Sequence, residues 1–445
     1  RFLKGQSLPP LLFAKRTQPG ANLEPVGSVT GIPSEVDQAA RDAWMPFFQG
    51  NVLDLVAHTS KFMAKYSQWL FRAPEFQVDP FSGQDLFDLC LVANKNSVGG
   101  LDGWTPADWS ILPLECFSLL ALLFVAIEEG ADWPADCLHA KAAFLAKEEN
   151  PSLDPLGYRI LLIFPILYRR WAAVRLKNLG PWVLSWWLPN FFAGGPGASA
   201  EDAWWLTALI VEHCQVSDNI FTAGIADILK CFDQIVRPLL EAILLMAGMP
   251  SKIVSAYMRY HENVFVYNAL AGGYGKAYKK RCSIPQGCPF SMMFIALLML
   301  PWVVMCNSMG LQPRVLADDI MLSTVGRDSS HFATWVEGFD KTHEYVEDLG
   351  ARLAPSKSFT CSTDNNFRIW LREHTWEKIG AKINVKNHFR DLGAHLNLVG
   401  GTRGKTLTDR MTKAINTVSK IAWLSHGTLH KIRFIFASAY SGGLY

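Results

Sequence analysis

Short apolar runs in the middle of the chain follow the alternating pattern of β-strands. FTAGIADI, RVLA and IMLSTV, at residues 221–228, 314–317 and 320–325, are rich in strand-forming residues and are bounded by turn residues. Residues 238–247 and 332–349 carry the wider apolar spacing of amphipathic helices. Strands that alternate with helices in this way predict an α+β fold, in which helices back an antiparallel sheet.

Two longer apolar runs reach the lower length limit of a membrane span. They cover residues 111–127 and 289–306, and proline interrupts each of them, at Pro113 and Pro301. From hydropathy alone, a membrane span and a buried helix are both open for these runs. Proline and glycine also break up the start of the chain, which becomes helix-like only near residues 37–69. We interpret residues 1–94 as an N-terminal extension or linker.

The formal net charge is only +2, but the charges are unevenly distributed. Residues 401–445 contain a single acid, Asp409, and seven cations, which are Arg403, Lys405, Arg410, Lys413, Lys420, Lys431 and Arg433. A second basic group consists of Lys276, Lys279, Lys280 and Arg281. Such clusters are either solvated surface or sequence-independent contacts to nucleic-acid phosphates.

Length and cysteine content favour an intracellular globular protein. A chain of 445 residues can form two or three subdomains with sizeable cores. Its nine cysteines are an odd number and include no CxxC pair, which favours reduced thiols over a disulfide framework or a zinc site. Because the sequence starts at Arg1, without a methionine or an apolar leader, we expect it to be part of a longer polyprotein.

Three carboxylates are placed where they could act together. Asp227 ends one strand-like run, and Asp318 and Asp319 form a doublet at a predicted hairpin turn. Alone, such a doublet is usually just a turn. Together the three could hold two divalent cations roughly 3.5–4 Å apart, as nucleotidyl transfer requires. Hard cations prefer oxygen ligands, so we expect two Mg²⁺ ions, with Mn²⁺ as a substitute.

The order of these motifs resembles the reverse transcriptase family, closest to its non-LTR retrotransposon (LINE-like) and group II intron branches. The resemblance covers about residues 95 to 400. Its blocks are NSVGGLDGWTPADW, FLAKEENPSLDPLGYRILLIFPILYRRWAAVRL, FFAGGPGASAEDAWW, GIADILKCFDQI, SIPQGCPFS, RVLADDIMLST, GARLAPSKSF and FRDLGAHL. A series of blocks in the family's order is far more specific than any one of them.

This resemblance implies a right-hand polymerase, with fingers at residues 95–210, a palm carrying the catalytic motifs at 211–395 and an incomplete helical thumb at 396–445. It implies RNA-directed DNA polymerase activity, with an RNA template, a DNA primer and dNTPs as partners. The run at 289–306 would then be a core helix beneath the palm, so no membrane is expected. For a LINE-like element the expected location is the nucleus.

The resemblance also implies roles for individual residues. Asp227, Asp318 and Asp319 would ligate the metals, and Lys357 would protonate or stabilise the leaving pyrophosphate. Lys147 and Arg159 would clamp the triphosphate. The remaining matches are Phe232 as a steric gate under the sugar, Pro285, Gln286 and Gly287 beside the nascent base pair, Leu392 and Gly393 as a primer grip, and Arg403, Lys405, Arg410 and Lys413 as primer and template contacts.

Some positions depart from the family's pattern, namely Leu316, Ile160, Ala198, Met292 and Ser283, the last of which stands where a glycine is expected. None of these changes removes a carboxylate. A catalytically decayed or domesticated relative that binds nucleic acid is therefore the alternative function. An RNA-dependent RNA polymerase is disfavoured by Ala317 and Phe232, because that class carries Gly-Asp-Asp and a small polar gate. Locally, Phe232 could instead be a core residue, and Asp233 either a neighbour of the metals or a helix N-cap.

Overall fold

The computed structural model describes residues 10–147, 152–195, 197–270, 273–399, 405–423 and 427–435. Its helices are α1 (Pro33–Gln49), α2 (Leu55–Lys65), α3 (Gly83–Leu91), α4 (Pro106–Trp109), α5 (Leu114–Glu128), η1 (Ala135–Cys137), η2 (Pro155–Gly157), α6 (Ile166–Asn178), α7 (Gly180–Trp186), α8 (Ala200–Val216), α9 (Cys231–Gln234), α10 (Arg237–Met246), α11 (Ser251–Asn263), α12 (Ser291–Ser308), α13 (Ser329–Asp348), α14 (Asn365–Glu373), α15 (Lys405–Ala422) and α16 (Thr428–Phe434). Its strands are β1 (Ala14–Lys15), β2 (Val29–Thr30), β3 (His139–Ala146), β4 (Tyr158–Ile163), β5 (Ile220–Asp227), β6 (Phe265–Leu270), β7 (Gly273–Tyr274), β8 (Gln312–Leu316), β9 (Asp319–Gly326), β10 (Phe359–Ser362), β11 (Asn384–Val385), β12 (His388–Asp391) and β13 (Ala394–Asn397).

The central sheet joins five strands in the order β11-β10-β5-β9-β8. β8, β9, β5 and β10 are successive antiparallel neighbours, and β11 runs parallel to β10. The strand-like runs of the sequence correspond to β5, β8 and β9, and the two helix-like runs correspond to α10 and α13. These local predictions are confirmed, and the mixture of helices and sheets is compatible with the predicted α+β class.

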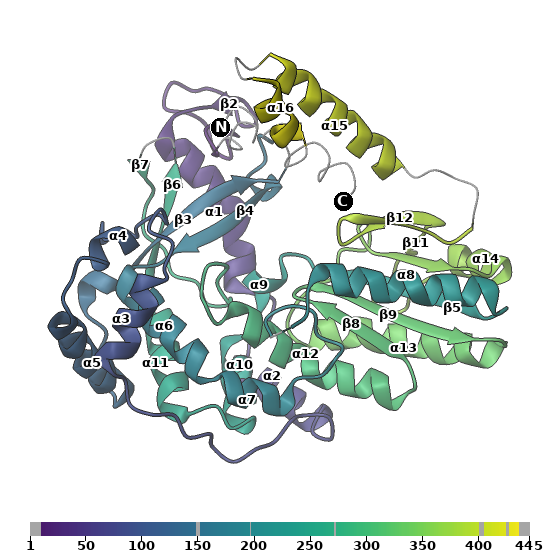
Figure 1. Ribbon diagram of the computed structural model, residues 1–445, viewed down its shortest axis with the longest axis horizontal. Helices are drawn as coiled ribbons and strands as arrows, with labels where there is room; N and C mark the ends of the chain where they lie inside the picture. Colours follow the sequence, from purple (N-terminus) through teal and green to yellow (C-terminus); the bar gives the residue numbers. More distant parts are fainter. Residues whose placement is uncertain are drawn as a thin grey trace.

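Helices cover both faces of the central sheet (Figure 1). Phe221, Ala223 and Ile225 of β5 point to one face, where they form a hydrophobic cluster with α8 and the β12–β13 hairpin. The other face packs on α13, and Gly224 leaves the space that the ring of Phe339 occupies. The alternation along β5 therefore supplies apolar contacts to two different layers.

A second sheet, in the order β4-β3-β6-β7, lies beside the central one. β3 and β4 form an antiparallel hairpin, and β6 runs parallel to β3. Two hydrogen bonds tie β4 and the η2 turn before it to the loops of the central region. The Leu162 amide of β4 donates to the Gln286 carbonyl at 2.7 Å, and Lys230 Nζ donates to the Leu156 carbonyl at 2.8 Å.

The N-terminal helices belong to the body of the molecule. Trp44 of α1 is 2% exposed and donates from Nε1 to the Pro155 carbonyl at 3.1 Å. Between α1 and α2, Asn51 Nδ2 donates to Gln234 Oε1 at 2.6 Å and to the Gly350 carbonyl at 2.9 Å. The main hydrophobic cluster also includes residues of both helices. α1 and α2 therefore pack on the rest of the chain, as an N-terminal extension can, and the assignment of residues 1–94 to an extension or linker remains a prediction.

Within the described residues, α12 is the one helix long and apolar enough to cross a membrane. It nevertheless lies inside the protein, because 78% of its 18-residue span is buried. This placement agrees with the core-helix interpretation of residues 289–306. The other apolar run forms α5, which has 15 residues and exposes Leu119 and Leu122.

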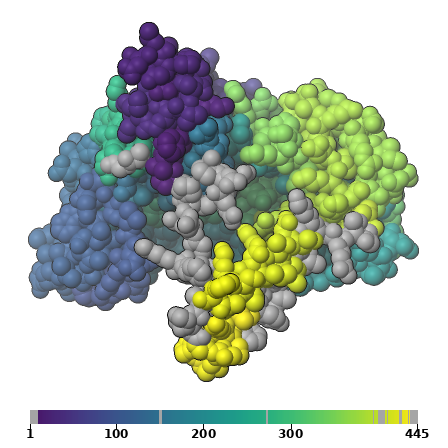
Figure 2. Space-filling view, turned by 90° about the horizontal axis from the view of Figure 1, so that it is seen from above, coloured from purple at the N-terminus to yellow at the C-terminus, as the bar shows by residue number. Residues whose placement is uncertain are grey.

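α15 and α16 extend away from the rest of the described chain (Figures 1 and 2). α15 contacts α16 and β13, and Met411 and Ile415 on its surface are largely exposed. An amphipathic helix with an uncovered apolar side is usually completed by a partner or by further chain.

Candidate functional site

Two of the three predicted carboxylates are direct neighbours in the central sheet. Asp227 is the last residue of β5, and Asp319, the first residue of β9, is its antiparallel partner. Opposite residues in such a pair point to the same face, with their Cβ atoms roughly 4.5–5.5 Å apart. Two like charges placed this closely destabilise a sheet, unless a positive group comes between them.

Asp318 lies on the tight turn that presents this pair. β8 ends at Leu316, opposite Asp319, so the connection consists of only Ala317 and Asp318. Ala317 adopts φ 58°, a left-handed conformation that costs an alanine about 1–2 kcal/mol. Strain of this kind is often found at functional sites. The turn therefore places Asp318 beside the Asp227–Asp319 pair at an energetic cost.

Burial shifts the protonation of all three carboxylates. It raises the pKa of Asp227 and Asp318, and it raises the pKa of Asp319 to about 6. The charge of Arg314 opposes the increase in the pKa of Asp319. The charges of Asp391, Asp318 and Asp227 add to it. Asp319 Oδ1 is buried and receives no hydrogen bond from the described part of the chain. This oxygen is an unused acceptor next to other negative charges, which suits a cation ligand.

Predicted cations surround the carboxylates. Lys357, in the loop between α13 and β10, and Lys147, which follows β3, lower the pKa of Asp227 by their charge. Arg159 of β4 and Lys147 do the same for Asp318. All three cationic side chains are exposed. The fold thus brings predicted metal ligands and predicted triphosphate ligands from distant parts of the chain to one place.

Lys230 is a further cation at this site that the sequence analysis missed. It has φ 46°, and its Nζ donates to the Leu156 and Tyr158 carbonyls at 2.8 and 3.3 Å. The same Nζ lies 4.1 Å from the centre of the Trp44 ring. Burial lowers its pKa to about 7, and the charge of Lys147 adds to this. Its spacing from Asp227 was visible in the sequence, but its partners come from distant segments.

The loop between Ser283 and Gly287 is held against β4. Ser283 is fully buried with φ 129°, and within the described residues its hydroxyl has no partner. A serine thus occupies a backbone conformation suited to the expected glycine. Gly287 has φ 111°, and a Cβ there would collide with the Leu162 carbonyl. The close contact with β4 therefore explains why residue 287 is a glycine. The predicted approach to a base pair is not needed for this explanation.

Pro285 is buried, and Gln286 is partly exposed next to it. Phe232 is 6% exposed and belongs to the main hydrophobic cluster, as the core interpretation requires. Its role as a sugar gate remains a prediction.

Asp233 forms a buried ion pair with Lys280, with 3.0 Å between Oδ1 and Nζ. It lies within α9, so the N-cap interpretation is wrong. The phosphate-contact interpretation is wrong for Lys280, because this side chain is 6% exposed and paired. Lys279 and Arg281 remain exposed, although each donates to a backbone carbonyl.

Leu392 and Gly393 form the tip of the β12–β13 hairpin, with φ 47° and 93°. Two central residues with positive φ are typical of a type I′ turn. The predicted basic contacts lie further along the chain. Arg403 is outside the described residues, as are the side chains of Lys405 and Arg410, whose backbone belongs to α15. Lys413 lies on the exposed surface of α15.

Among the described residues, no group of three or more His, Cys, Asp or Glu side chains has the geometry of a metal site. The three carboxylates are therefore neighbours without forming a closed cage. The all-oxygen donor set and the unused Asp319 Oδ1 nevertheless fit a hard divalent cation.

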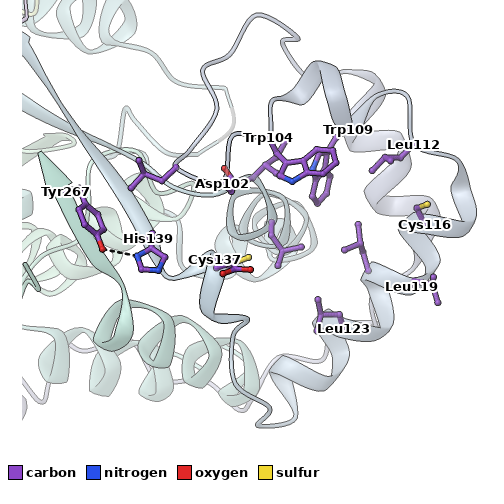
Figure 3. Close-up of a pocket in the computed structure, with 15 residues that line it drawn as sticks. Asp102, Trp104, Trp109, Leu112, Cys116, Leu119, Leu123, Cys137, His139 and Tyr267 are labelled. Atoms are coloured by element: carbon purple, nitrogen blue, oxygen red, sulfur yellow. Dashed lines mark hydrogen bonds between the residues drawn. The ribbon is translucent and has the colours of Figure 1, made fainter. Parts of the chain in front are cut away.

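A cavity of about 1010 Å³ lies elsewhere, between α5, α6 and strands β3 and β6 (Figure 3). Its wall is mainly apolar and includes Trp104, Leu119 and Leu123. Its polar groups include Asp102 and a hydrogen bond between Tyr267 and His139, 3.2 Å long. None of the predicted site residues lines this cavity, so it is distinct from the carboxylate site.

The sequence matches no model of a known protein family and no curated protein.

Proposed function

We propose that this chain is an RNA-directed DNA polymerase, which adds dNTPs to the 3′-hydroxyl of a primer. The observation that carries the proposal is the pairing of Asp227 with Asp319 at one end of the central sheet, beside the turn carboxylate of Asp318. A sheet gains nothing from two partly buried like charges in register. Such an arrangement is expected where positively charged ligands are to be bound.

The surrounding residues suit the chemistry of nucleotidyl transfer. Two Mg²⁺ ions, when bound to the carboxylates, would neutralise charge on the attacking and leaving oxygens. Lys147 and Arg159 would hold the triphosphate, with Arg159 able to make two parallel hydrogen bonds. The primer 3′-oxygen bonds to the α-phosphorus while the bond to pyrophosphate breaks. The hydroxyl proton leaves to solvent, and Lys357 would donate a proton to the pyrophosphate.

In this proposal the molecule is a right hand. The fingers are residues 95–210, which include β3 and β4, the palm is residues 211–395, which include the central sheet, and α15 and α16 begin a thumb. Template and primer would lie across the carboxylate end of the palm, where Lys230 adds a cation beside the triphosphate ligands. The partners are an RNA template, a DNA primer and dNTPs, and for a LINE-like element the location is the nucleus.

A second candidate is a relative that binds nucleic acid without catalysing synthesis. The observation in its favour is Ser283, a strained and fully buried serine at the position of an expected glycine. A chain under selection for polymerase efficiency would be expected to lose such strain, unless it serves the reaction.

Primer extension tests the proposal. The protein is incubated with an RNA template, a DNA primer, dNTPs and Mg²⁺, beside Asp227→Asn. As a matched control, Asp132→Asn removes an exposed aspartate from a loop outside the site. We expect extension by the wild type and the control, and none by Asp227→Asn. Template-primer binding without extension by the wild type would favour the second candidate.

A further inference from the structure

A buried ion pair connects the β12–β13 hairpin to the central sheet. Arg314 of β8 and Asp391 of β12 are 3% and 4% exposed. They are joined by two parallel hydrogen bonds, Nη1 to Oδ2 at 2.7 Å and Nη2 to Oδ1 at 2.8 Å. Arg314 Nη1 also donates to Thr207 Oγ1 of α8 at 2.9 Å. One guanidinium therefore links a strand, a helix and the hairpin.

This pair lies between the hairpin tip and the carboxylates. Arg314 is the register partner of Met321, and Leu316, two residues later in β8, is the partner of Asp319. Residues two apart in a strand point to the same face, so Arg314 and Asp319 are diagonal neighbours on it. On the hairpin side, Asp391 directly precedes the tip residue Leu392. A short covalent and hydrogen-bonded path thus connects the tip to Asp319.

Stability alone does not account for an ion pair at this place. Burying two charges costs desolvation, and well-packed apolar residues are often as stable as such a pair or more stable. The hairpin already has apolar contacts, since Phe389 and Leu396 belong to the cluster on this face. Apolar packing tolerates small shifts. A planar guanidinium that donates to both oxygens of one carboxylate fixes the distance and the orientation between the two groups. The pair is therefore suited to holding a position.

We propose that Arg314 is a positioning residue, which holds the β12–β13 hairpin at a fixed distance from Asp319 so that the hairpin tip places the 3′ end of a primer strand against the carboxylates. This inference rests on the proposed polymerase function. Its partner is a nucleic-acid 3′ terminus. Neither Arg314 nor Asp391 touches the reacting atoms in this scheme.

The double variant Arg314→Met/Asp391→Leu tests the proposal, because it replaces the pair with apolar residues of similar size. We expect it to melt at the wild-type temperature or above, while kcat for single-nucleotide addition falls by roughly tenfold or more and KM for the dNTP changes little. Arg314→Lys keeps the charge but loses the fork, so we expect an intermediate kcat. A stable double variant with wild-type kcat would overturn the proposal.

A second buried arginine–carboxylate pair among the described residues provides a matched control. Arg175 and Glu128 are joined at 2.6 Å in the helical region around α5 and α6. The variant Arg175→Met/Glu128→Leu should melt like the double variant at Arg314 and keep wild-type kcat. A similar loss of kcat in this control would show that replacing any buried ion pair lowers the rate of nucleotide addition. That result would also overturn the proposal.

Photocrosslinking separates this inference from the polymerase proposal. A primer with 4-thiothymidine at its 3′ end is annealed to an RNA template and irradiated with the protein. We expect a crosslink within residues 388–397 in the wild type and its loss in the Arg314 double variant. A crosslink without any extension would refute the polymerase activity but support the placement. Extension without a crosslink to the hairpin would refute the placement alone.

Discussion

Two carboxylates, the buried Glu128 between α5 and α6 and the partly buried Asp319 in the central sheet, differ in how their oxygens are hydrogen-bonded. Glu128 accepts three hydrogen bonds, two from Arg175 at 2.7 and 2.6 Å and one from Trp171 Nε1 at 2.9 Å. Asp319 lies opposite another aspartate, and its Oδ1 receives nothing from the described residues. A buried carboxylate whose oxygens accept nearly all the hydrogen bonds that they can is typical of a residue that stabilises the fold. An unused acceptor among like charges is the mark of one kept for a ligand.

The largest expected effect is on catalysis, at Asp319. In the proposed polymerase, Asp319→Asn should lower the rate of primer extension by about 10³-fold or more, because losing a proposed metal ligand would remove several kcal/mol of transition-state stabilisation. The melting temperature should stay the same or rise, since the substitution removes one of two like charges in register. Extension assays and calorimetry measure the two effects. A variant that loses stability and activity together would make Asp319 a structural residue like Glu128.

Glu128→Gln should show the reverse pattern. It leaves Arg175 buried without its counter-charge, so we expect the free energy of unfolding to fall by about 3–5 kcal/mol. Denaturant unfolding measures this loss. At temperatures where the variant stays folded, its extension rate should match the wild type. A stable Glu128→Gln protein would remove the contrast between the two regions.

A third kind of buried ionisable group is His343 in α13, which is 1% exposed. Burial lowers its pKa to about 4, with a smaller contribution from His374. Its nearest acid is Asp340, 4.0 Å away between Nδ1 and Oδ1, and Glu347 and Lys378 line the same surface depression.

Because the folded pKa of His343 lies below the unfolded value, its contribution to stability is complete above about pH 6.5 and is lost as the pH falls towards 4. The loss should reach about 3 kcal/mol. Unfolding measured from pH 7 to 4 should therefore show a shallower decline for His343→Gln than for the wild type. Equal slopes would mean that other groups cause the acid sensitivity.

The smallest expected effect concerns Ser283. Ser283→Gly removes both the backbone strain at φ 129° and a buried hydroxyl without a partner, so it should raise the free energy of unfolding by about 1–2 kcal/mol. Ser362→Gly is the control, because Ser362 is a buried, hydrogen-bonded residue of β10 and its loss should destabilise. If extension falls in Ser283→Gly while stability rises, the strain serves the reaction.

Local features of this fold could be predicted from the sequence. β5, β8, β9, α10 and α13 follow from apolar spacing and turn residues, which are properties of neighbouring positions. The doublet turn and the glycine-like position of Ser283 follow from the motif pattern. The family resemblance, the domain boundaries and the cellular location remain predictions.

Features that depend on distant partners could not be predicted. Lys280 looked like a phosphate contact because it stands in a basic run, but the fold buries it against Asp233. The sequence did not single out Arg314 and Asp391, since only the folded chain brings them within hydrogen-bond distance. The packing of α1 and its following loop could not be predicted for the same reason, as the hydrogen bonds of Trp44 and Asn51 reach residues more than a hundred positions away.

The attachment of α1 and α2 has a consequence for motion. Trp44 is bonded to the carbonyl of Pro155 beside the second sheet, while Asn51 is bonded to Gln234 and Gly350 beside the central sheet. This N-terminal segment, called the strap below, is therefore hydrogen-bonded on both sides of the joint between the two sheets. If the second sheet swings over a bound nucleotide, as polymerase fingers commonly do on microsecond to millisecond timescales, the strap must either travel with it or release the Asn51 bonds. The stiffness of the joint would then set how fast the proposed polymerase opens between additions.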